Sequence, residues 1–354
     1  MINLVRQAFR PDGGAEKAIN DYMQAFAKLG WDHRLICATE GWANLPSHQL
    51  VSLGPVSRGR FGSSQFTKRV SVHMESHPDQ IYQSHQWTPG AQVIRLGDGL
   101  HSTWLKRSSA HASGLKNLAR NLSTFHRSRL IEQKLTLEHS RLRVIIVNSN
   151  MVAQDLLAEY PRLSSKVHVI RNLTRCHREV IQMPVGAQTF GFVGSGWERK
   201  GLVYVLKALA QLPAAQLLIA GSDSNEAKYR SLAQKLGLGE RVSWLGVTLD
   251  LESIYSEIHA LVHPAIYDPF PNTIIEAMAY GCPVVISDST GAVDFSGQEG
   301  VFVTPLDYLC LAEHMNSAAQ SGLAVRKELA EFVRHYDVDY LASCLEKAYE
   351  DFQF

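Results

Sequence analysis

The chain has 354 residues, more than one hydrophobic core usually fills, so we expect two domains of roughly 150 to 200 residues each. It carries 35 Lys and Arg against 34 Asp and Glu, and a net charge of +1 gives no general reason to expect a nucleic-acid partner. The five cysteines are scattered and never spaced C-x-x-C, which argues against a disulfide framework or a zinc site and fits a reducing cytoplasm.

Short apolar runs alternate with helical patterns, which is typical of β-α-β units and a mainly parallel sheet. In the first half we expect strands in INLVRQAF, HRLICAT, QIYQSHQ, RVIIVNSN and VHVIRN, and helices in GGAEKAINDYMQAFAKLG and MVAQDLLAEY. The N-terminus reaches Arg6 before any apolar run of signal-peptide length, and no stretch approaches the about 18 apolar residues of a membrane span. We therefore expect neither an export signal nor a spanning helix.

Residues 171–188 are polar and without a clear period, so they are expected to form a linker. The alternation restarts at TFGFVGS and continues through ALVHPAI, TIIEAMAYG and PVVIS. The pattern predicts domains over 1–170 and 189–335. Two doubly wound halves place a ligand cleft between them, at the carboxyl ends of their strands.

Two features of the first domain could serve a ligand. Gly13 and Gly14 separate the first strand from its helix, where a plain tight turn is the alternative explanation. His85 lies near the end of a later strand, where a histidine satisfied by its own loop is the more common case.

Residues 101–134 are basic and partly amphipathic. Their cations, set against the single carboxylate of Glu132, are Lys106, Arg107, Lys116, Arg120, Arg127, Arg129 and Lys134. Such a stretch can lie on an anionic membrane surface, and a solvated helical face explains it equally well. Nucleic acid is a poorer explanation, because no recognition motif accompanies the charge.

The second domain opens with a strand that ends at Val193 and continues in a Gly-Ser-Gly turn, with Arg199 and Lys200 before a helix expected from Gly201. Glycines such as Gly194 let the backbone approach a ligand, and two cations could neutralise a diphosphate leaving group. A solvated basic pair is the alternative, although the helix dipole disfavours cations at a helix start. As a dinucleotide fingerprint GSGWER is incomplete, because its third glycine is replaced by Arg199.

The stretch YDPFPNTIIEA places Asp268 in the loop after a buried strand and Glu276 in the helix that follows. Loops at that edge of an open α/β sheet bind ligands. Helix amides and the helix dipole suit a phosphate, and carboxylates accept hydrogen bonds from sugar hydroxyls. The alternatives are a plain turn at Asp268 and a capping box of Thr273 with Glu276.

The sequence DPFPNTIIEAMAYGCPVV resembles the E-x7-E motif of retaining glycosyltransferases of family 4, with Asp268 in place of the first Glu. The segment from His85 to His101 resembles bacterial lipopolysaccharide core glycosyltransferases, in which SH…PG…R.GDG.H recurs. The likeness covers nearly the whole chain and is strongest from Thr189 to Asp294. It implies the GT-B fold, an α/β architecture of two facing Rossmann-like domains, with 336–354 forming a helix that packs back on the N-terminal domain.

The resemblance also implies the roles of individual residues. Asp268 would hold hydroxyls of the transferred sugar, Glu276 would bind the ribose, and Lys200 with Arg199 would grip the donor phosphates. The implied catalytic residues are His85, Arg199, Lys200 and Asp268. The implied donor-binding residues are Gly13, Gly14, Gly194, Phe270, Pro271, Asn272, Thr273 and Glu276. The implied acceptor-side residues are Asp12, Glu16 and Asp98.

The reaction implied is transfer of a hexose from a nucleotide-sugar, for which we expect UDP, to a hydroxyl of a lipopolysaccharide core or related glycan with retained anomeric configuration. In the family's favoured account, attack is front-side and the leaving diphosphate takes the acceptor's proton while Lys200 and Arg199 offset its charge. No metal or other cofactor is expected. We expect a cytoplasmic enzyme, peripheral on the inner face of the cytoplasmic membrane through residues 101–134.

Three other functions remain open. A nucleotide-sugar 2-epimerase of the same fold would convert its substrate without an acceptor. A nicotinamide-dependent oxidoreductase shares the Rossmann pattern, against which the incomplete fingerprint argues. The replacement of the first Glu by Asp268 leaves open a catalytically inactive protein that binds sugar nucleotides.

Overall fold

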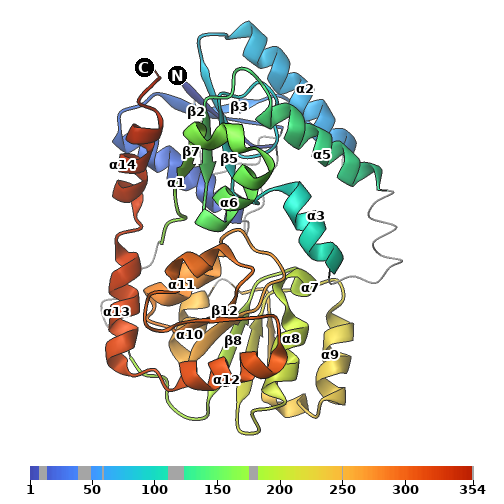
Figure 1. Ribbon diagram of the computed structural model, residues 1–354, viewed down its shortest axis with the longest axis vertical. Helices are drawn as coiled ribbons and strands as arrows, with labels where there is room; N and C mark the ends of the chain where they lie inside the picture. Colours follow the sequence, from blue (N-terminus) through green and yellow to red (C-terminus); the bar gives the residue numbers. More distant parts are fainter. Residues whose placement is uncertain are drawn as a thin grey trace. The chain divides into compact units, whose positions relative to one another are not determined.

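Contacts divide the chain into two compact units, Met1–Leu173 with Val338–Phe354, and Thr174–Asp337. The computed structural model describes residues 1–7, 14–38, 49–57, 60–110, 123–174, 182–248 and 250–352, with the backbone alone at 15, 16, 60 and 61. Thr174 and the described residues of the expected linker, 182–188, belong to the second unit. The chain thus leaves the first unit once and returns to it for its last helix (Figure 1).

The first unit is built on a seven-stranded parallel sheet in the order β3-β2-β1-β4-β5-β6-β7. Its strands are β1 (Ile2–Val5), β2 (His33–Cys37), β3 (Leu50–Ser52), β4 (Ile81–Ser84), β5 (Val93–Leu96), β6 (Val144–Val147) and β7 (Val167–Val169). The sequence pattern missed β3 and β5. In β5 the reason is Arg95, a buried cation that interrupts an otherwise apolar run.

Helices cover both faces of this sheet. They are α1 (Gly14–Lys28), α2 (Arg60–Ser76), α3 (His101–Ala110), α5 (Thr124–Leu137), α6 (Asn150–Glu159) and α14 (Val338–Ala348). Leu4 packs with α1 and α14, and its neighbour Val5 packs with α2, because successive strand residues point to opposite faces. The C-terminal helix α14 therefore shares one core with α1, and the two helices lie side by side in Figure 1.

The second unit contains a six-stranded parallel sheet in the order β10-β9-β8-β11-β12-β13. Its strands are β8 (Thr189–Val193), β9 (Gln216–Ala220), β10 (Val242–Gly246), β11 (Ala260–His263), β12 (Val284–Ser287) and β13 (Val301–Thr304). Its helices are α7 (Trp197–Lys200), α8 (Leu202–Leu209), α9 (Glu226–Lys235), α10 (Leu251–Glu257), α11 (Asn272–Ala279), α12 (Tyr308–Ala319) and α13 (Leu323–Arg334).

Both sheets have a topological switch point, where strand order reverses. It lies between β1 and β4 in the first unit and between β8 and β11 in the second. Ligands of open α/β sheets bind at the carboxyl ends of strands beside such a point. His85 directly follows β4, Gly194 follows β8 and Asp268 lies in the loop after β11, so both units carry predicted site residues at this edge. The two expected Rossmann-like α/β units are confirmed.

Two further expectations concern helices and cysteines. No helix within the described ranges is both long and apolar enough to cross a membrane. Cys37, Cys282, Cys310 and Cys344 carry free thiols.

Candidate active site

The turn after β8 differs from the expectation in one respect. Arg199 and Lys200 do not precede a helix but form the last turn of the short helix α7, and Gly201 joins α7 to α8. Cations are favoured at that end of a helix, so the dipole argument against an ordinary basic pair was wrong. Asp223 holds the start of α7, because its Oδ2 accepts from the Trp197 amide at 2.8 Å.

The Lys200 side chain folds back over Gly194. A Cβ at Gly194 would lie 2.4 Å from Lys200 Nζ, and the backbone there has φ +123°. Nζ donates a long hydrogen bond of 3.4 Å to the Val193 carbonyl and, among the described residues, forms no ion pair. Burial lowers the pKa of Lys200, and the charge of Asp268 opposes that shift. The ammonium group is therefore held at the strand end, ready for an anion.

Asp268 is fixed from several directions. Its Oδ2 accepts from Arg199 Nη1 at 3.0 Å and from His263 Nε2 at 3.1 Å. Its amide donates to the Ser289 carbonyl at 3.3 Å, and its own carbonyl accepts from the Gly291 amide at 2.8 Å. Burial opposes ionisation, but Arg199 and His263 hold the pKa of Asp268 well below its usual value. Asp268 is thus a rigid carboxylate rather than a plain turn-former.

His263 was not predicted from the sequence as a site residue. It ends β11, it is 1% exposed, and burial lowers its pKa to about 4, so the ring is neutral at physiological pH. Because Asp268 is ionised, the Nε2 atom that contacts it carries the proton and donates. The sequence offered one signal for this role, a histidine five residues before the carboxylate of the loop. The apolar run of the strand indicated only that His263 occupies a core position.

The helix α11 begins at Asn272, with Pro271 as its N-cap residue. Thr273 lies inside the helix and its buried hydroxyl has no hydrogen-bond partner, so Thr273 is not the cap and that alternative was wrong. Glu276 lies one turn further along, and its Oε2 accepts from Tyr255 Oη at 3.4 Å. The start of α11, with the positive end of its dipole, therefore follows Asp268 directly.

Phe270 and Gly194 act through their backbones if they contact a ligand. The Phe270 ring is 4% exposed and packs edge-on against Phe295, with ring centroids 5.4 Å apart. The charged groups that act on the ammonium group of Lys200 are Asp268, Arg199 and Glu276. The second unit thus brings together the cations and carboxylates that the sequence singled out.

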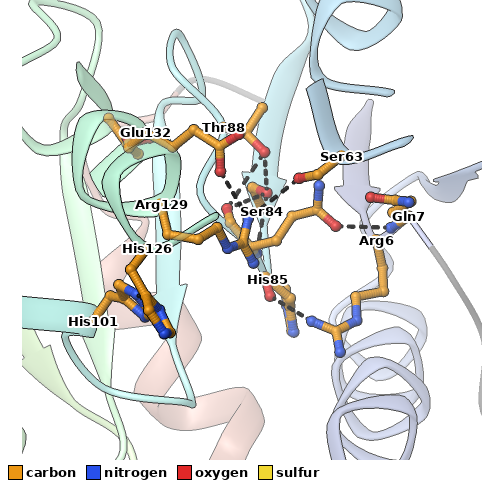
Figure 2. A network of polar contacts seen from close by, with 12 residues as sticks. Arg6, Gln7, Ser63, Ser84, His85, Thr88, His101, His126, Arg129 and Glu132 are labelled. Carbon is orange, nitrogen blue, oxygen red and sulfur yellow. Dashed lines mark hydrogen bonds and ion pairs between the residues drawn. The ribbon is translucent and has the colours of Figure 1, made fainter. Parts of the chain in front are cut away.

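In the first unit, His85 lies at the end of β4 within a polar network (Figure 2). Arg6 Nη1 donates to the His85 carbonyl at 3.0 Å, and Ser84 Oγ lies 2.8 Å from Thr88 Oγ1. The His85 ring is 6% exposed, and burial, with the charges of Arg95 and Arg6, holds its pKa well below the usual value. His85 is therefore neutral and cannot act as a cation at pH 7.

A second group in Figure 2 joins α3 to α5. His101 Nε2 lies 3.1 Å from His126 Nδ1, and burial and His126 lower the pKa of His101 to about 4. Arg129 donates to Glu132 at 2.8 Å and to Ser63 of α2 at 3.2 Å. Arg129 of the basic stretch is therefore engaged inside the unit.

The remaining predicted residues of the first unit are less informative. Asp98 is exposed in the turn after β5, and Gly14 is the first residue of α1. Asp12, Gly13 and the side chain of Glu16 lie outside the described residues.

Comparison with known families identifies the two halves. A model of "Glycosyltransferase Family 4" matches residues 12–178, and a model of "Glycosyl transferases group 1" matches residues 175–335. The two matches overlap over 175–178, just after the division of the structural units between Leu173 and Thr174. The chain belongs to the glycosyltransferases. Its Asp268, Lys200 and Glu276 all lie within the group 1 half of this glycosyltransferase.

Similar proteins include lipopolysaccharide enzymes. The glycosyltransferase is 23% identical to the lipopolysaccharide glucosyltransferase WaaG of Escherichia coli K12, over 96% of this chain and 94% of that protein. It is 30% identical to the lipopolysaccharide core biosynthesis glycosyltransferase LpsE of Rhizobium meliloti, over 39% of this chain and 43% of that one.

Solved structures share the fold. The crystal structure of WaaG superposes with a TM-score of 0.78 at 20% identity, covering 99% of each chain. Anabaena Alr3699/HepE in complex with UDP and glucose superposes with a TM-score of 0.74 at 19% identity, again over 99% of each chain. The glycosyltransferase therefore has the GT-B fold and is related to lipopolysaccharide core glycosyltransferases.

Proposed function

We propose that this glycosyltransferase moves a hexose from a UDP-linked donor to a hydroxyl of a lipopolysaccharide core or related cell-surface glycan, with retention of anomeric configuration and without a metal. The observation that carries the donor assignment is the rigid, ionised Asp268 beside the Lys200 ammonium at the switch point of the second unit. UDP is chosen because HepE, which shares the fold, binds UDP and glucose.

The charges suit the departure of a nucleoside diphosphate. Asp268 Oδ2 receives the bonds from Arg199 and His263, which leaves Oδ1 to accept from a sugar hydroxyl. Lys200 lies against Gly194 without an ion pair in the described part of the chain, so it can offset the charge that grows on the diphosphate. In a front-side attack the diphosphate oxygen takes the acceptor proton, and no side-chain nucleophile is needed.

The first test is calorimetric titration with UDP, GDP and ADP in the presence of a chelator. We expect saturable binding of UDP that weakens at least tenfold in Lys200→Ala and in Glu276→Ala, because each loses a contact to a charged or ribose group. Lys235→Ala, which removes an exposed cation from α9, is the matched control and should bind UDP normally. Equal UDP binding by Lys200→Ala and the control would refute the donor site.

The second test separates transfer from the alternatives. UDP-hexose is incubated with and without a core oligosaccharide, and the anomeric configuration of the product is read from proton NMR couplings. Transfer that requires the oligosaccharide and retains configuration is expected, with turnover about a hundredfold lower in Lys200→Ala. Conversion of the donor alone would establish an epimerase, and binding without turnover would establish an inactive binding protein.

Peripheral membrane binding through residues 101–134 remains part of the proposal. Helix α5 exposes Phe125, Ile131 and Leu135, at 44%, 60% and 54%, beside Arg127 and Lys134. Apolar and cationic side chains on one exposed stretch suit an anionic interface. Lys116 and Arg120 lie outside the described residues.

The basic stretch is less uniformly charged than its sequence indicates. Arg107 pairs with Asp155 of α6 at 3.3 Å and Arg129 with Glu132, so Glu132 is not the only carboxylate that these cations meet. Lys134→Glu should weaken sedimentation with anionic vesicles severalfold, whereas Lys235→Glu on α9 should not. Equal sedimentation of the two variants would rule out this surface.

A further inference from the structure

A cluster of polar side chains lies in the first unit beside its switch point and includes none of the residues that we assign to the donor. It consists of Tyr22 of α1, His85 after β4 and Arg95 of β5. The Tyr22 and His85 rings meet edge to face with centroids 5.0 Å apart, and Arg95 Cζ lies 5.7 Å from the Tyr22 ring centroid. Their exposed fractions are 3%, 6% and 8%, so each is more than nine-tenths buried.

Each of these three side chains has a buried polar atom without a hydrogen-bond partner. The atoms are Tyr22 Oη, His85 Nδ1 and Arg95 Nε. A buried polar atom left unpaired is costly, and native structures contain few of them. Three such atoms on side chains that gather around Tyr22 indicate a group from outside the chain that pairs with them.

The three unpaired atoms are all donors. Tyr349 Oη donates to Gln83 Oε1, which turns the Gln83 amide nitrogen toward His85 Nε2 at 2.7 Å. His85 Nε2 is then the acceptor, and the proton of the neutral ring lies on Nδ1. Arg95 Nε always carries a proton, and burial raises the pKa of Tyr22 to about 12 against the opposing interaction with Arg95, so the Tyr22 hydroxyl stays protonated.

The charged groups that act on this cluster are Arg95 itself, Arg6 and the carboxylate of Asp21. Arg95 Nη2 donates to the neutral amide oxygen of Asn172 at 2.7 Å, and within the described ranges no carboxylate pairs with it. A Cβ at Gly97 would lie 2.1 Å from Arg95 Nη1, so the glycine gives the guanidinium its room. Arg6, which donates to the His85 carbonyl, adds a second cation near His85. A buried cation without a counter-charge favours an anionic ligand.

We propose that Tyr22, His85 and Arg95 bind an anionic group, a phosphate or a carboxylate, carried by the acceptor glycan. Oxygen atoms of such a group would accept from Arg95 Nε, Tyr22 Oη and His85 Nδ1, satisfying all three donors. Assigning the anion to the acceptor rests on the proposed transferase function, whereas the binding of an anion at this cluster does not. The acceptor is then a negatively charged saccharide rather than a neutral one.

The experiment uses full-length Lys200→Ala protein, so that phosphate binding at the Lys200 site of the second unit is weakened. It is titrated calorimetrically with inorganic phosphate, glucose 6-phosphate and glucose. Saturable binding of phosphate is expected, tighter binding of glucose 6-phosphate, and none of glucose. Adding Arg95→Met should weaken phosphate binding about tenfold or more, and adding Tyr22→Phe about fivefold, as the loss of a charged and a neutral hydrogen bond predicts.

Tyr82→Phe is the matched control. Its hydroxyl is also buried in the first unit but bonds to His73 on the opposite face of the sheet, so phosphate binding should not change. If Arg95→Met fails to fold, the effect of Tyr22→Phe on phosphate binding decides the test, because that substitution removes only one oxygen atom. Absence of saturable phosphate binding, or equal binding by Tyr22→Phe and Tyr82→Phe, overturns the site.

Binding of phosphate without binding of glucose 6-phosphate overturns the assignment to a saccharide. The proposed transferase function is tested separately by titrating the wild-type protein with UDP, because UDP binding reports on the second unit.

Discussion

Gly194 and Gly196 lie two residues apart in the turn after β8, and both adopt positive φ, +123° and +75°. A side chain at Gly196 would enter open space, whereas one at Gly194 would collide with Lys200 Nζ. Substitutions at the two glycines therefore distinguish the effect of backbone strain from the effect of displacing the Lys200 ammonium group.

Replacing each glycine by Ala tests this difference. Both variants should lose roughly 1 to 3 kcal/mol of stability through backbone strain. Only Gly194→Ala should also lose UDP affinity, by about tenfold, because the displaced ammonium no longer meets the diphosphate. Thermal melting and UDP titration measure the two effects, and equal UDP affinities would show that Lys200 does not need the space above Gly194.

At the level of elements, α11 is held at both ends. Its start follows the Asp268 loop, and its C-terminal turn is bound by Arg326 of α13, whose Nη1 donates to the Gly281 carbonyl at 3.3 Å and Nη2 to the His259 carbonyl at 2.7 Å. Arg326 is 1% exposed, and burial lowers its pKa. This buried cation links α13 to the turn that follows α11, the helix after the Asp268 loop.

Arg326→Met should cost the second unit roughly 2 to 5 kcal/mol, because two buried carbonyls lose their donor. Differential scanning calorimetry should show a lower melting temperature for that unit only, since no contact of Arg326 reaches the described residues of the first unit. Arg334→Met, on the same helix but exposed and paired with Glu331, should change stability by less than about 1 kcal/mol. Equal shifts for both variants would contradict this role.

At the scale of the whole molecule, each unit buries a neutral histidine at its switch point, His85 in the first and His263 in the second. Both rings have lowered pKa values in the folded state. Between the folded and the ordinary pKa the unfolded chain binds more protons, so stability rises with pH in that window and is lost as the solution is acidified. For His263 the window runs from pH 6.5 to about 4.

Urea unfolding at pH 7.5, 6 and 5 should therefore show both units losing stability as pH falls. Across its full window His263 accounts for roughly 3 kcal/mol. His263→Gln removes the titration while keeping a donor for Asp268, so the second unit should lose less stability on acidification. The pKa of Asp268 is lowered in the same direction, but its contribution to stability is lost only below about pH 4, where the carboxyl group of the unfolded chain takes up a proton. An unchanged slope in His263→Gln would exclude the histidine as the cause.

The predicted elements and the motif residues could be recognised in the sequence for different reasons. Apolar runs such as those of β6 and β11 are buried on both faces and are recognisable without tertiary knowledge. The motif residues Lys200, Asp268 and Glu276 could be found because glycines, prolines and carboxylates cluster in short loops. His263, Arg326 and Tyr22 could not, because a polar residue inside a strand or a helix stripe gives no local sign of its partner.

The sequence by itself determined the alternation of strands and helices, the two-unit organisation and the loops that carry Lys200 and Asp268, because each depends on periodicity and turn chemistry within a few residues. Only the tertiary structure decided that Arg199 and His263 share one carboxylate oxygen, that Lys200 lies over Gly194, and that Tyr22, His85 and Arg95 meet with unpaired donors. Those contacts join residues up to 73 positions apart, from Tyr22 to Arg95, and hydrogen bonds and charge interactions form only when folding brings such segments within a few ångströms.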